Sequence, residues 1–231
     1  MIRLKDFQRV VFFTGAGLSA ESGIPTYRGK GGIWEKYDYE EYACQRAFDA
    51  DPEKVWDFHD ERRRFVAKCE PNEGHRIIAG TPGATVVTQN IDGMHQRAGS
   101  KGVVELHGSL WRVRCARCRA VTENLDAPIR SRRCTCGSYL RPDIVWFEDI
   151  LDPATVRAAG DAIAKCDLLV SVGTSGVVYP AADLPRLALS RGAVCVEINP
   201  EETPLSPLYT HCLRGGAAEM LGTLVRPAAP P

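Results

Sequence analysis

The sequence lacks the features that mark membrane, secreted and broadly nucleic-acid-binding proteins. Its 29 lysines and arginines are balanced by 29 aspartates and glutamates, so no excess charge attracts nucleic acid or an anionic membrane. No apolar run reaches the roughly 18 residues that a membrane helix needs. No apolar signal segment follows the charged residues 1–10. We therefore expect a cytoplasmic protein with no membrane partner and no direct nucleic-acid partner.

The composition favours a folded protein with its own core. The chain has 231 residues, of which 44% are hydrophobic and 25% charged, as is typical of globular proteins. At roughly 150 residues per domain, this length predicts one or two domains that need no disulfides. Short termini leave little surface for recruiting partners, so we expect a monomer.

Nine cysteines are an odd number for a disulfide framework, and four of them are close together in the sequence. The clustered residues are Cys115, Cys118, Cys134 and Cys136. In a protein that is not exported, such a group is typical of metal ligands, and four thiolates suit one structural Zn²⁺. Iron and a chance grouping are the alternatives. The second pair is one residue shorter than the usual two-residue spacing, which weakens the match.

Apolar runs alternate with helical patterns along most of the chain. The runs predict buried parallel strands at residues 10–13, 84–88, 103–106, 168–172 and 193–198. Asp51-Pro52 and Asp152-Pro153 are N-cap signals that open helices over residues 52–68 and 154–165, and a third helix is expected at 180–190. This alternation predicts an α/β fold with a doubly wound, parallel, Rossmann-like sheet.

Two stretches do not fit that sheet. Residues 29–68 are rich in aromatic and charged side chains, and residues 112–141 hold the cysteines among many arginines. We expect a smaller second domain from residues 31–70 and 111–141, a helical insertion plus a zinc-ribbon module. Residues 1–30, 71–110 and 142–231 would form the discontinuous sheet domain. The arginines favour a charge-mixed surface over a nucleic-acid contact because the whole chain is neutral.

The first predicted strand runs into a glycine-rich turn of the dinucleotide-binding type, G-x-G-x-x-A, at residues 15–20. Such glycines let backbone N–H groups approach a pyrophosphate. Gly23 and Pro25 leave little room for the usual crossover helix, and no acidic ribose ligand follows about 20 residues on. Both departures disfavour a hydride-transferring dehydrogenase.

Polar residues stand just beyond two predicted strands, where open α/β sheets place their ligands. Asn90 and Asp92 follow one strand, and His107 follows the next, before a glycine that permits close approach. Turn formation and a buried core histidine are the alternatives. Histidine is the side chain best suited to proton abstraction near neutral pH.

Several segments resemble, in order, the signatures of the sirtuins, the NAD⁺-dependent protein-lysine deacylases. They read GAGLSAESGIPTYRG (15–29), TQNIDGMH (88–95), LHG (106–108), LRPDIVWF (140–147), GTSGVVYPAA (173–182) and EINP (197–200). With the cysteine module, the resemblance spans about residues 10–221. The sequence resembles the bacterial type of sirtuin that is related to the desuccinylase and demalonylase branch.

The resemblance implies that an acyl group passes from lysine to NAD⁺, giving nicotinamide, O-acyl-ADP-ribose and free lysine. His107 would act as general base, while Asn90 and Asp92 would orient the ribose and the nicotinamide amide. The implied NAD⁺-binding residues are Gly15, Ala16, Gly17, Ser19, Ala20, Pro25, Tyr27, Arg28, Gln89, Asn90, Ile91, Asp92, His107, Gly173, Thr174, Ser175, Asn199 and Ala217. The zinc would be structural, since four protein ligands leave no open position. Acyl-lysine proteins would bind as an extended peptide beside Val145, Phe147 and Val177.

One branch of this family removes succinyl, malonyl and glutaryl groups with a tyrosine and an arginine three residues apart on a helix. The matching residues here are His59 and Arg62, and Ala43 matches a small residue that widens the acyl channel. Residues three apart share a helix face, so both side chains can reach one pocket. We expect acidic acyl groups to be accepted as well as acetyl. The alternative is that residues 62–64 form a solvated basic helix face.

Two other functions fit the same residues. One is mono-ADP-ribosyl transfer from the same NAD⁺ site, and the other is a non-enzymatic module that binds NAD⁺ or ADP-ribose. Retention of Asn90, Asp92 and His107 favours deacylation over both. Glu148 follows Phe147 where the family often has glycine, and this departure touches the substrate contacts.

Overall fold

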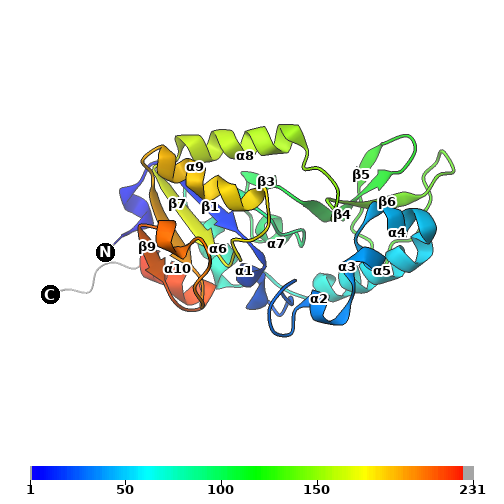
Figure 1. Cartoon of the computed structure of the whole chain (residues 1–231), viewed down its shortest axis with the longest axis horizontal. Helices are drawn as coiled ribbons and strands as arrows, with labels where there is room; N and C mark the ends of the chain where they lie inside the picture. The colour runs from blue at the N-terminus through cyan, green and yellow to red at the C-terminus, as the bar shows by residue number, and fades with distance from the viewer. Residues whose placement is uncertain (1, 226–231) are drawn as a thin grey trace.

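The computed structural model describes residues 2–225, and it contains a six-stranded parallel sheet and a separate three-stranded antiparallel sheet (Figure 1). The proline-rich tail at residues 226–231, for which the sequence predicts disorder, lies outside the described residues. The parallel strands, in spatial order, are β3 (Val103–Glu105), β2 (Thr85–Thr88), β1 (Val10–Thr14), β7 (Leu168–Val172), β8 (Val194–Ile198) and β9 (His211–Leu213). The five predicted strands are therefore confirmed.

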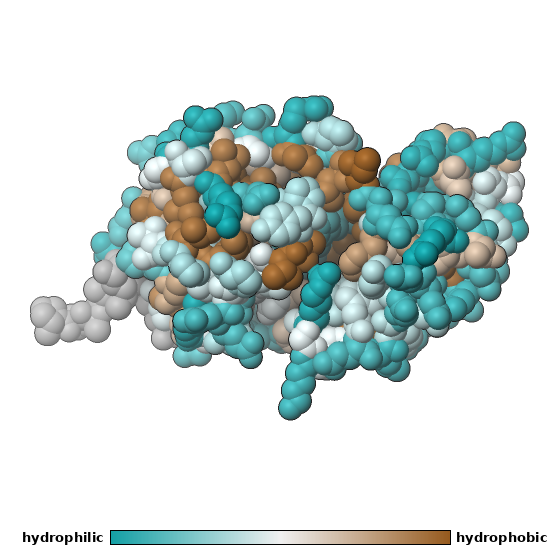
Figure 2. Space-filling model, in the orientation of Figure 1, coloured by the Kyte–Doolittle hydropathy of each residue, from teal (hydrophilic) through white to brown (hydrophobic). Residues whose placement is uncertain are grey.

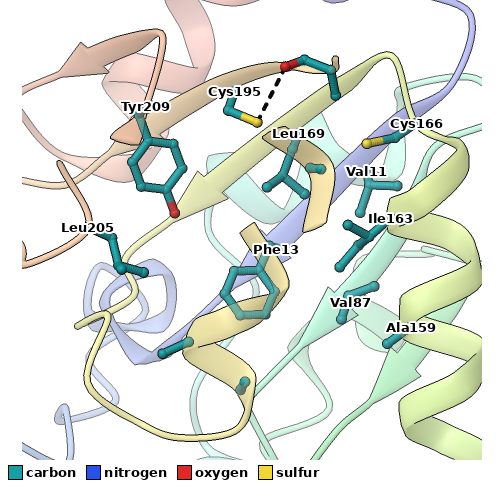
Figure 3. Close-up of a cluster of buried hydrophobic side chains, with 14 of the residues drawn as sticks. Val11, Phe13, Val87, Ala159, Ile163, Cys166, Leu169, Cys195, Leu205 and Tyr209 are labelled. Carbon is teal, nitrogen blue, oxygen red and sulfur yellow. Dashed lines mark hydrogen bonds between the residues drawn. The ribbon is translucent and has the colours of Figure 1, made fainter. Parts of the chain in front are cut away.

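Helices cover both faces of the parallel sheet, so the predicted doubly wound α/β fold is confirmed. The elements around this sheet are η1 (Leu4–Asp6), α1 (Ala16–Ala20), α6 (Glu73–Ala79), α7 (Met94–Arg97), α8 (Pro153–Lys165), η2 (Ala181–Asp183), α9 (Leu184–Ser190), η3 (Ser206–Leu208) and α10 (Ala217–Val225). Val11 and Phe13 of β1 face α8 and α9, where Ile163 packs on them (Figure 3). Phe12 points to the opposite face, toward Leu18 of α1 and the helices α6 and α10.

The two aspartate–proline signals begin helices where the sequence predicts. The Asp51 carboxylate accepts a hydrogen bond from Lys54 N at 3.0 Å, at the start of α5 (Pro52–Ala67). Asp152 caps α8 in the same way through Thr155 N at 2.8 Å. The third predicted helix, over 180–190, differs slightly, because it begins as the 3₁₀ turn η2 and becomes α-helical only at Leu184.

The smaller part of the molecule combines four helices with the antiparallel sheet. They are α2 (Ile33–Lys36), α3 (Tyr39–Tyr42), α4 (Gln45–Ala50) and α5, with strands β5 (Val121–Glu123), β4 (Gly108–Cys115) and β6 (Leu140–Ile144) in spatial order. Phe48 and Trp56 of the helices share one core with Leu110, Val113 and Trp146 of the strand segments. The two insertions therefore fold against each other.

The arginine-rich segment is largely neutralised by acidic neighbours. Arg132 forms ion pairs with Glu53 at 2.5 Å, Asp57 at 2.6 Å and the buried Asp60 at 2.9 Å, all on α5. Arg132 thereby ties the cysteine-bearing loop to the helical insertion, and this agrees with a charge-mixed surface.

The antiparallel sheet runs slightly beyond the predicted small-domain segment 111–141, since β4 starts at Gly108 and β6 ends at Ile144. The domain division itself stays a prediction. Among the described residues, no helix combines the length and apolar character that a membrane crossing requires.

Candidate active site

A cleft of about 1430 Å³ lies at the carboxyl ends of the parallel strands and is lined by residues of both parts. Figure 2 shows a notch at this position, between the larger and the smaller part, with apolar surface on its rim. A cavity of this size holds a large ligand such as a dinucleotide, with room for part of a second molecule.

Two glycine loops meet at the base of the cleft. A Cβ atom on Gly15 would lie 2.7 Å from the Gly173 carbonyl oxygen, and one on Gly17 would lie 2.7 Å from Gly173 Cα. Gly173 itself has φ +62°, and its Cβ would lie 2.4 Å from Leu18 N. Only glycine fits at these three positions, and the two loops pack backbone against backbone, with Gly17 N donating to the Gly173 carbonyl at 2.9 Å. No side chain of these glycines fills the space at the start of α1. This cradle fits a pyrophosphate.

Asn90 occupies the cleft wall, and Asp92 lies behind it. Asn90 Nδ2 donates to the Gly15 carbonyl at 3.0 Å and to the Ser19 hydroxyl at 3.2 Å. Ser19 in turn donates to Asp92 at 2.7 Å. Burial raises the pKa of the Asp92 carboxyl, while hydrogen bonds from Met94 N and Ser19 lower it. In this structure Asp92 therefore acts through Ser19 and Asn90 on the cleft.

His107 has the geometry of a general base. Its Nδ1 lies 3.0 Å from the Gln89 carbonyl oxygen. Because a carbonyl only accepts, Nδ1 carries the hydrogen, and Nε2 is the basic nitrogen. Nε2 has no hydrogen-bond partner among the residues described, and the side chain lines the cleft. Burial lowers the pKa of His107, which keeps the imidazole neutral and able to accept a proton near pH 7.

Most of the residues predicted to bind NAD⁺ line this one cleft. They are Gly15, Ala16, Gly17, Ala20, Tyr27, Arg28, Gln89, Asn90, Ile91, His107, Gly173, Thr174, Ser175, Asn199 and Ala217. Ser19 and Asp92 lie one layer deeper, and the exposed Pro25 does not line the cleft. Consecutive residues of one loop can point toward the cleft or away from it. The sequence alone does not show which residues of a motif line the cleft and which lie behind its wall.

The end of the cleft near β8 is held by a buried carboxylate. Glu197 accepts hydrogen bonds from Thr203 and Ser206, both at 2.5 Å, and from Arg214 at 2.6 Å. These contacts fix the loop that follows β8, in which Asn199 Nδ2 donates to the Thr174 carbonyl at 2.8 Å. Asn199, one of the residues implied to bind NAD⁺, is therefore held in place by hydrogen bonds.

The sequence analysis missed two buried histidines beneath the cleft. His75 Nε2 lies 3.5 Å from the Ser19 hydroxyl, and His95 Nε2 lies 2.9 Å from the Thr14 hydroxyl. Burial lowers the pKa of His75 to about 4 and that of His95 to about 3, so both are neutral at pH 7. Neither residue lines the cleft, and their role is to support the polar network around Ser19.

Residues predicted to hold the acyl group come together on the smaller part. Ala43, His59 and Arg62 all line the cleft. Arg62 Nη2 donates to the Tyr27 hydroxyl at 3.1 Å, and its guanidinium carbon lies 4.8 Å from the centre of that ring. Within the described chain, Arg62 has no carboxylate partner. Trp34 and Phe58, which the sequence analysis did not assign, stack at 6.2 Å and complete an aromatic wall.

The two neighbouring arginines differ from Arg62. Arg63 is completely buried and bonds to loop carbonyls, whereas Arg64 is exposed. The alternative of a uniformly solvated basic face at residues 62–64 is therefore wrong.

His59 is held as a neutral ring. Its Nε2 accepts a hydrogen bond from Trp146 Nε1 at 3.2 Å, so Nδ1 carries the hydrogen. Burial, with the nearby Arg62 and Arg141 guanidinium groups, lowers the pKa of His59 to about 3. The Nδ1 atom is buried and makes no well-formed hydrogen bond among residues 2–225, although the Tyr42 backbone acts on the ring and raises the pKa. The ring therefore carries no charge, and Nδ1 has almost no surface open to the cleft.

The segment expected to pair with a peptide uses part of its backbone internally. Val145 N donates to the His107 carbonyl at 2.9 Å, and Phe147 N donates to the Ala43 carbonyl at 3.0 Å. These two N–H groups are thus occupied. Across the cleft, Val178 lines the cavity, and its neighbour Val177 is 46% exposed. The predicted peptide contact of Val177 stays a prediction.

The four clustered cysteines converge in the smaller part. Their sulfur atoms all lie within 4.8 Å of one another, with Cys115 and Cys136 at 3.5 Å and Cys118 and Cys134 at 3.7 Å. Four thiolates placed about 2.3 Å from one Zn²⁺ in a tetrahedron have sulfur–sulfur distances of about 3.8 Å. The short Cys134–Cys136 spacing therefore still permits a tetrahedral zinc site. The cluster is distant in the fold from the glycine cradle, which fits a structural role.

These features define a dinucleotide-binding protein whose cleft lies between a doubly wound sheet and a smaller, metal-supported part. Residues 15–180 match the model of the Sir2 family, and the chain belongs to that family.

A protein from Pyrobaculum aerophilum named "NAD-dependent protein deacylase 2" is 48% identical over 96% of this chain and 92% of its own length. A solved complex of a Sir2 homologue variant with ADP-ribose is 44% identical, with a TM-score of 0.92 over 96% of this chain and 92% of that one. A Sir2–p53 peptide–NAD⁺ complex is 31% identical, with a TM-score of 0.82 over 96% of this chain and 93% of the other.

Proposed function

We propose that this chain, as an NAD⁺-dependent protein deacylase of the Sir2 family, removes acidic acyl groups from lysine as well as acetyl. The deacylase activity follows from family membership and from relatives such as the 48% identical P. aerophilum protein. The observation that carries the chemistry is His107, whose Nδ1 is fixed on the Gln89 carbonyl while Nε2 lies free in the cleft.

In the proposed reaction NAD⁺ is a co-substrate that lies across the glycine cradle and is consumed. His107 Nε2 takes a proton from a ribose hydroxyl as the acyl group passes from the lysine to the sugar. Asn90, supported by Ser19 and Asp92, positions the nicotinamide side. The products are nicotinamide, O-acyl-ADP-ribose and free lysine. Mono-ADP-ribosyl transfer is not favoured, and release of one free lysine for each nicotinamide separates deacylation from it.

The proposed acceptance of acidic acyl groups rests on Arg62, a cation of the cleft lining. Arg62 has no carboxylate partner among the described residues, and His59, which also lines the cleft, is neutral. A cation without a counter-ion in a cleft favours a ligand that supplies a carboxylate. The carboxylate of a succinyl or malonyl group would accept charge-assisted hydrogen bonds from Arg62.

The acyl-lysine protein would enter as an extended peptide. Because the N–H groups of Val145 and Phe147 are occupied and that of Asp149 closes a turn, we place the pairing at the N–H groups of Glu148 and Ile150, within residues 147–150, on one side and at residues 175–178 on the other. The solved Sir2–p53 peptide–NAD⁺ complex, which is similar to this chain, supports the proposal that a peptide binds here. The domain division, a monomeric state and a cytoplasmic location stay predictions.

The acyl preference is tested with one lysine peptide carrying acetyl in one assay and succinyl in the other. In Arg62→Met, kcat/KM for the succinyl peptide should fall about 10- to 150-fold, since a hydrogen bond to a charged group contributes about 1.5–3 kcal/mol. Turnover of the acetyl peptide should change much less. Arg64→Met, which removes the exposed arginine two positions along, is the control and should leave both rates unchanged. If succinyl is not removed by the native enzyme, or if the mutant loses both activities equally, Arg62 is not an acyl-carboxylate ligand.

A further inference from the structure

A tight turn follows the strand that borders the peptide side of the cleft. Asp149 N donates to the Trp146 carbonyl at 3.1 Å and closes a four-residue turn. The Asp149 carboxylate accepts from Trp146 N at 3.1 Å and from Arg141 at 2.8 Å, so the turn is locked at both ends. Its third residue is Glu148.

Glu148 has a backbone conformation that side chains rarely adopt. Its φ is +74°, in the left-handed region, and the third position of such a turn favours glycine. A glutamate there costs free energy that a glycine would not, so local backbone energetics do not favour the glutamate at this position. Strained residues of this kind gather at functional sites.

The Glu148 carboxylate is exposed on the rim of the cleft and only loosely paired. Its side chain is 59% exposed, and the residue lines the cleft next to Phe147. Its one ion-pair partner among residues 2–225 is Arg46, at 3.8 Å, and Arg46 is held more closely by Glu40 at 2.5 Å. The negatively charged Glu148 carboxylate, which has only a weak ion pair, therefore lies where the turn borders the proposed path of the peptide.

We propose that Glu148 selects substrates with a lysine or arginine close in sequence to the acyl-lysine. This inference rests on the proposed binding of an extended peptide along residues 147–150. A peptide on that path passes its flanking side chains over the rim, where the Glu148 carboxylate attracts a cationic group and repels an acidic one. Exposed ion pairs are weak, so the preference is expected to be about two- to fivefold in kcat/KM.

The test uses acetyl-lysine peptides in which one flanking position at a time carries arginine or glutamine. The ratio of kcat/KM for the two peptides is measured with the native enzyme, with Glu148→Gln and with Glu148→Gly, at about 50 and 300 mM salt. The native ratio should exceed two at one or more positions and shrink at high salt, because the pair is screened. Both variants should bring the ratio to about one while still deacylating the glutamine peptide.

Glu41→Gln is the matched control, since it removes an exposed carboxylate of α3 that pairs with Lys54 rather than Arg46 and lies outside the cleft lining. It should leave the ratio unchanged. A native ratio of one, or an unchanged ratio in Glu148→Gln, overturns the inference while deacylation stands. Loss of the ratio in Glu148→Gly alone also overturns it, because the backbone and not the charge would then set the preference. If no peptide is deacylated, the proposed function itself fails.

Discussion

The buried guanidinium of Arg63 should be one of the largest single contributions to the stability of the smaller part. Arg63 Nε and Nη2 donate to the Asp126 carbonyl at 2.9 and 2.7 Å, and Nη2 also donates to the Asn124 carbonyl at 2.6 Å. Nη1 bonds to the Leu110 carbonyl. The side chain is fully buried on α5. One residue thus binds the helix, strand β4 and the loop after β5 together.

Replacement by methionine keeps the length and the apolar stem but removes every donor. Three backbone carbonyls would lose their partner, and each buried acceptor left unsatisfied costs about 1–3 kcal/mol. Because the variant also removes the cost of burying a guanidinium, we expect a net loss toward the low end, about 3–5 kcal/mol. For a protein of this size each kcal/mol lowers Tm by about 2–4 °C, so Arg63→Met should lower Tm by about 6–20 °C. Thermal unfolding followed by circular dichroism on the zinc-loaded protein measures this.

The neighbouring residue provides the control. Arg64 is exposed, and Arg64→Met should change the free energy of unfolding by less than about 0.5 kcal/mol. If the two variants melt within 2 °C of each other, about the shift of half a kcal/mol, the carbonyl contacts of Arg63 do not stabilise the fold and the reasoning is refuted.

Three further predictions concern the site. His107→Ala should lower kcat by at least about 100-fold while isothermal titration shows NAD⁺ affinity within threefold, and a near-normal rate would remove the base assignment. Because burial lowers the pKa of His107, the neutral base is lost only when pH falls below the ordinary value of about 6.5. The acid limb of kcat/KM should therefore lie below that pH, and a midpoint above 7 would contradict it. Purified protein should hold about one zinc and unfold on chelation, and less than about half an equivalent with intact folding would disprove the structural role.

The large sheet could be predicted because its strands are buried on both faces and read as apolar runs. β9 could not, since it has three largely exposed residues at the sheet edge and no apolar run. β6 carries Pro142, which argues against a strand, but it pairs only with β4 and so tolerates a missing N–H on its outer side. Whether an edge segment forms a strand depends more on the strand beside it than on its own residues, so its sequence predicts it poorly.

The site was predictable wherever one motif supplies the chemistry, as with His107 and the glycine turn. The site was not predictable where a residue's role depends on how far its side chain lies below the cleft surface. Ser19 and Asp92 lie behind the cleft wall, and Phe58 and Trp34 reach the cleft from a segment that carries no motif. The difference between the buried Arg63 and the exposed Arg64 likewise follows from the direction of α5, which adjacent positions in a sequence do not reveal.

The strand order of the parallel sheet has a consequence for synthesis on the ribosome. β1 lies at the centre, with Val10 and Phe12 paired to Leu168 and Val170 of β7. The first strand made must therefore wait for more than 150 further residues before its second neighbour exists. Pairings this distant along the chain form slowly and leave an apolar edge open meanwhile. During translation, the β7-facing edge of β1 should therefore stay unpaired until β7 has emerged from the exit tunnel.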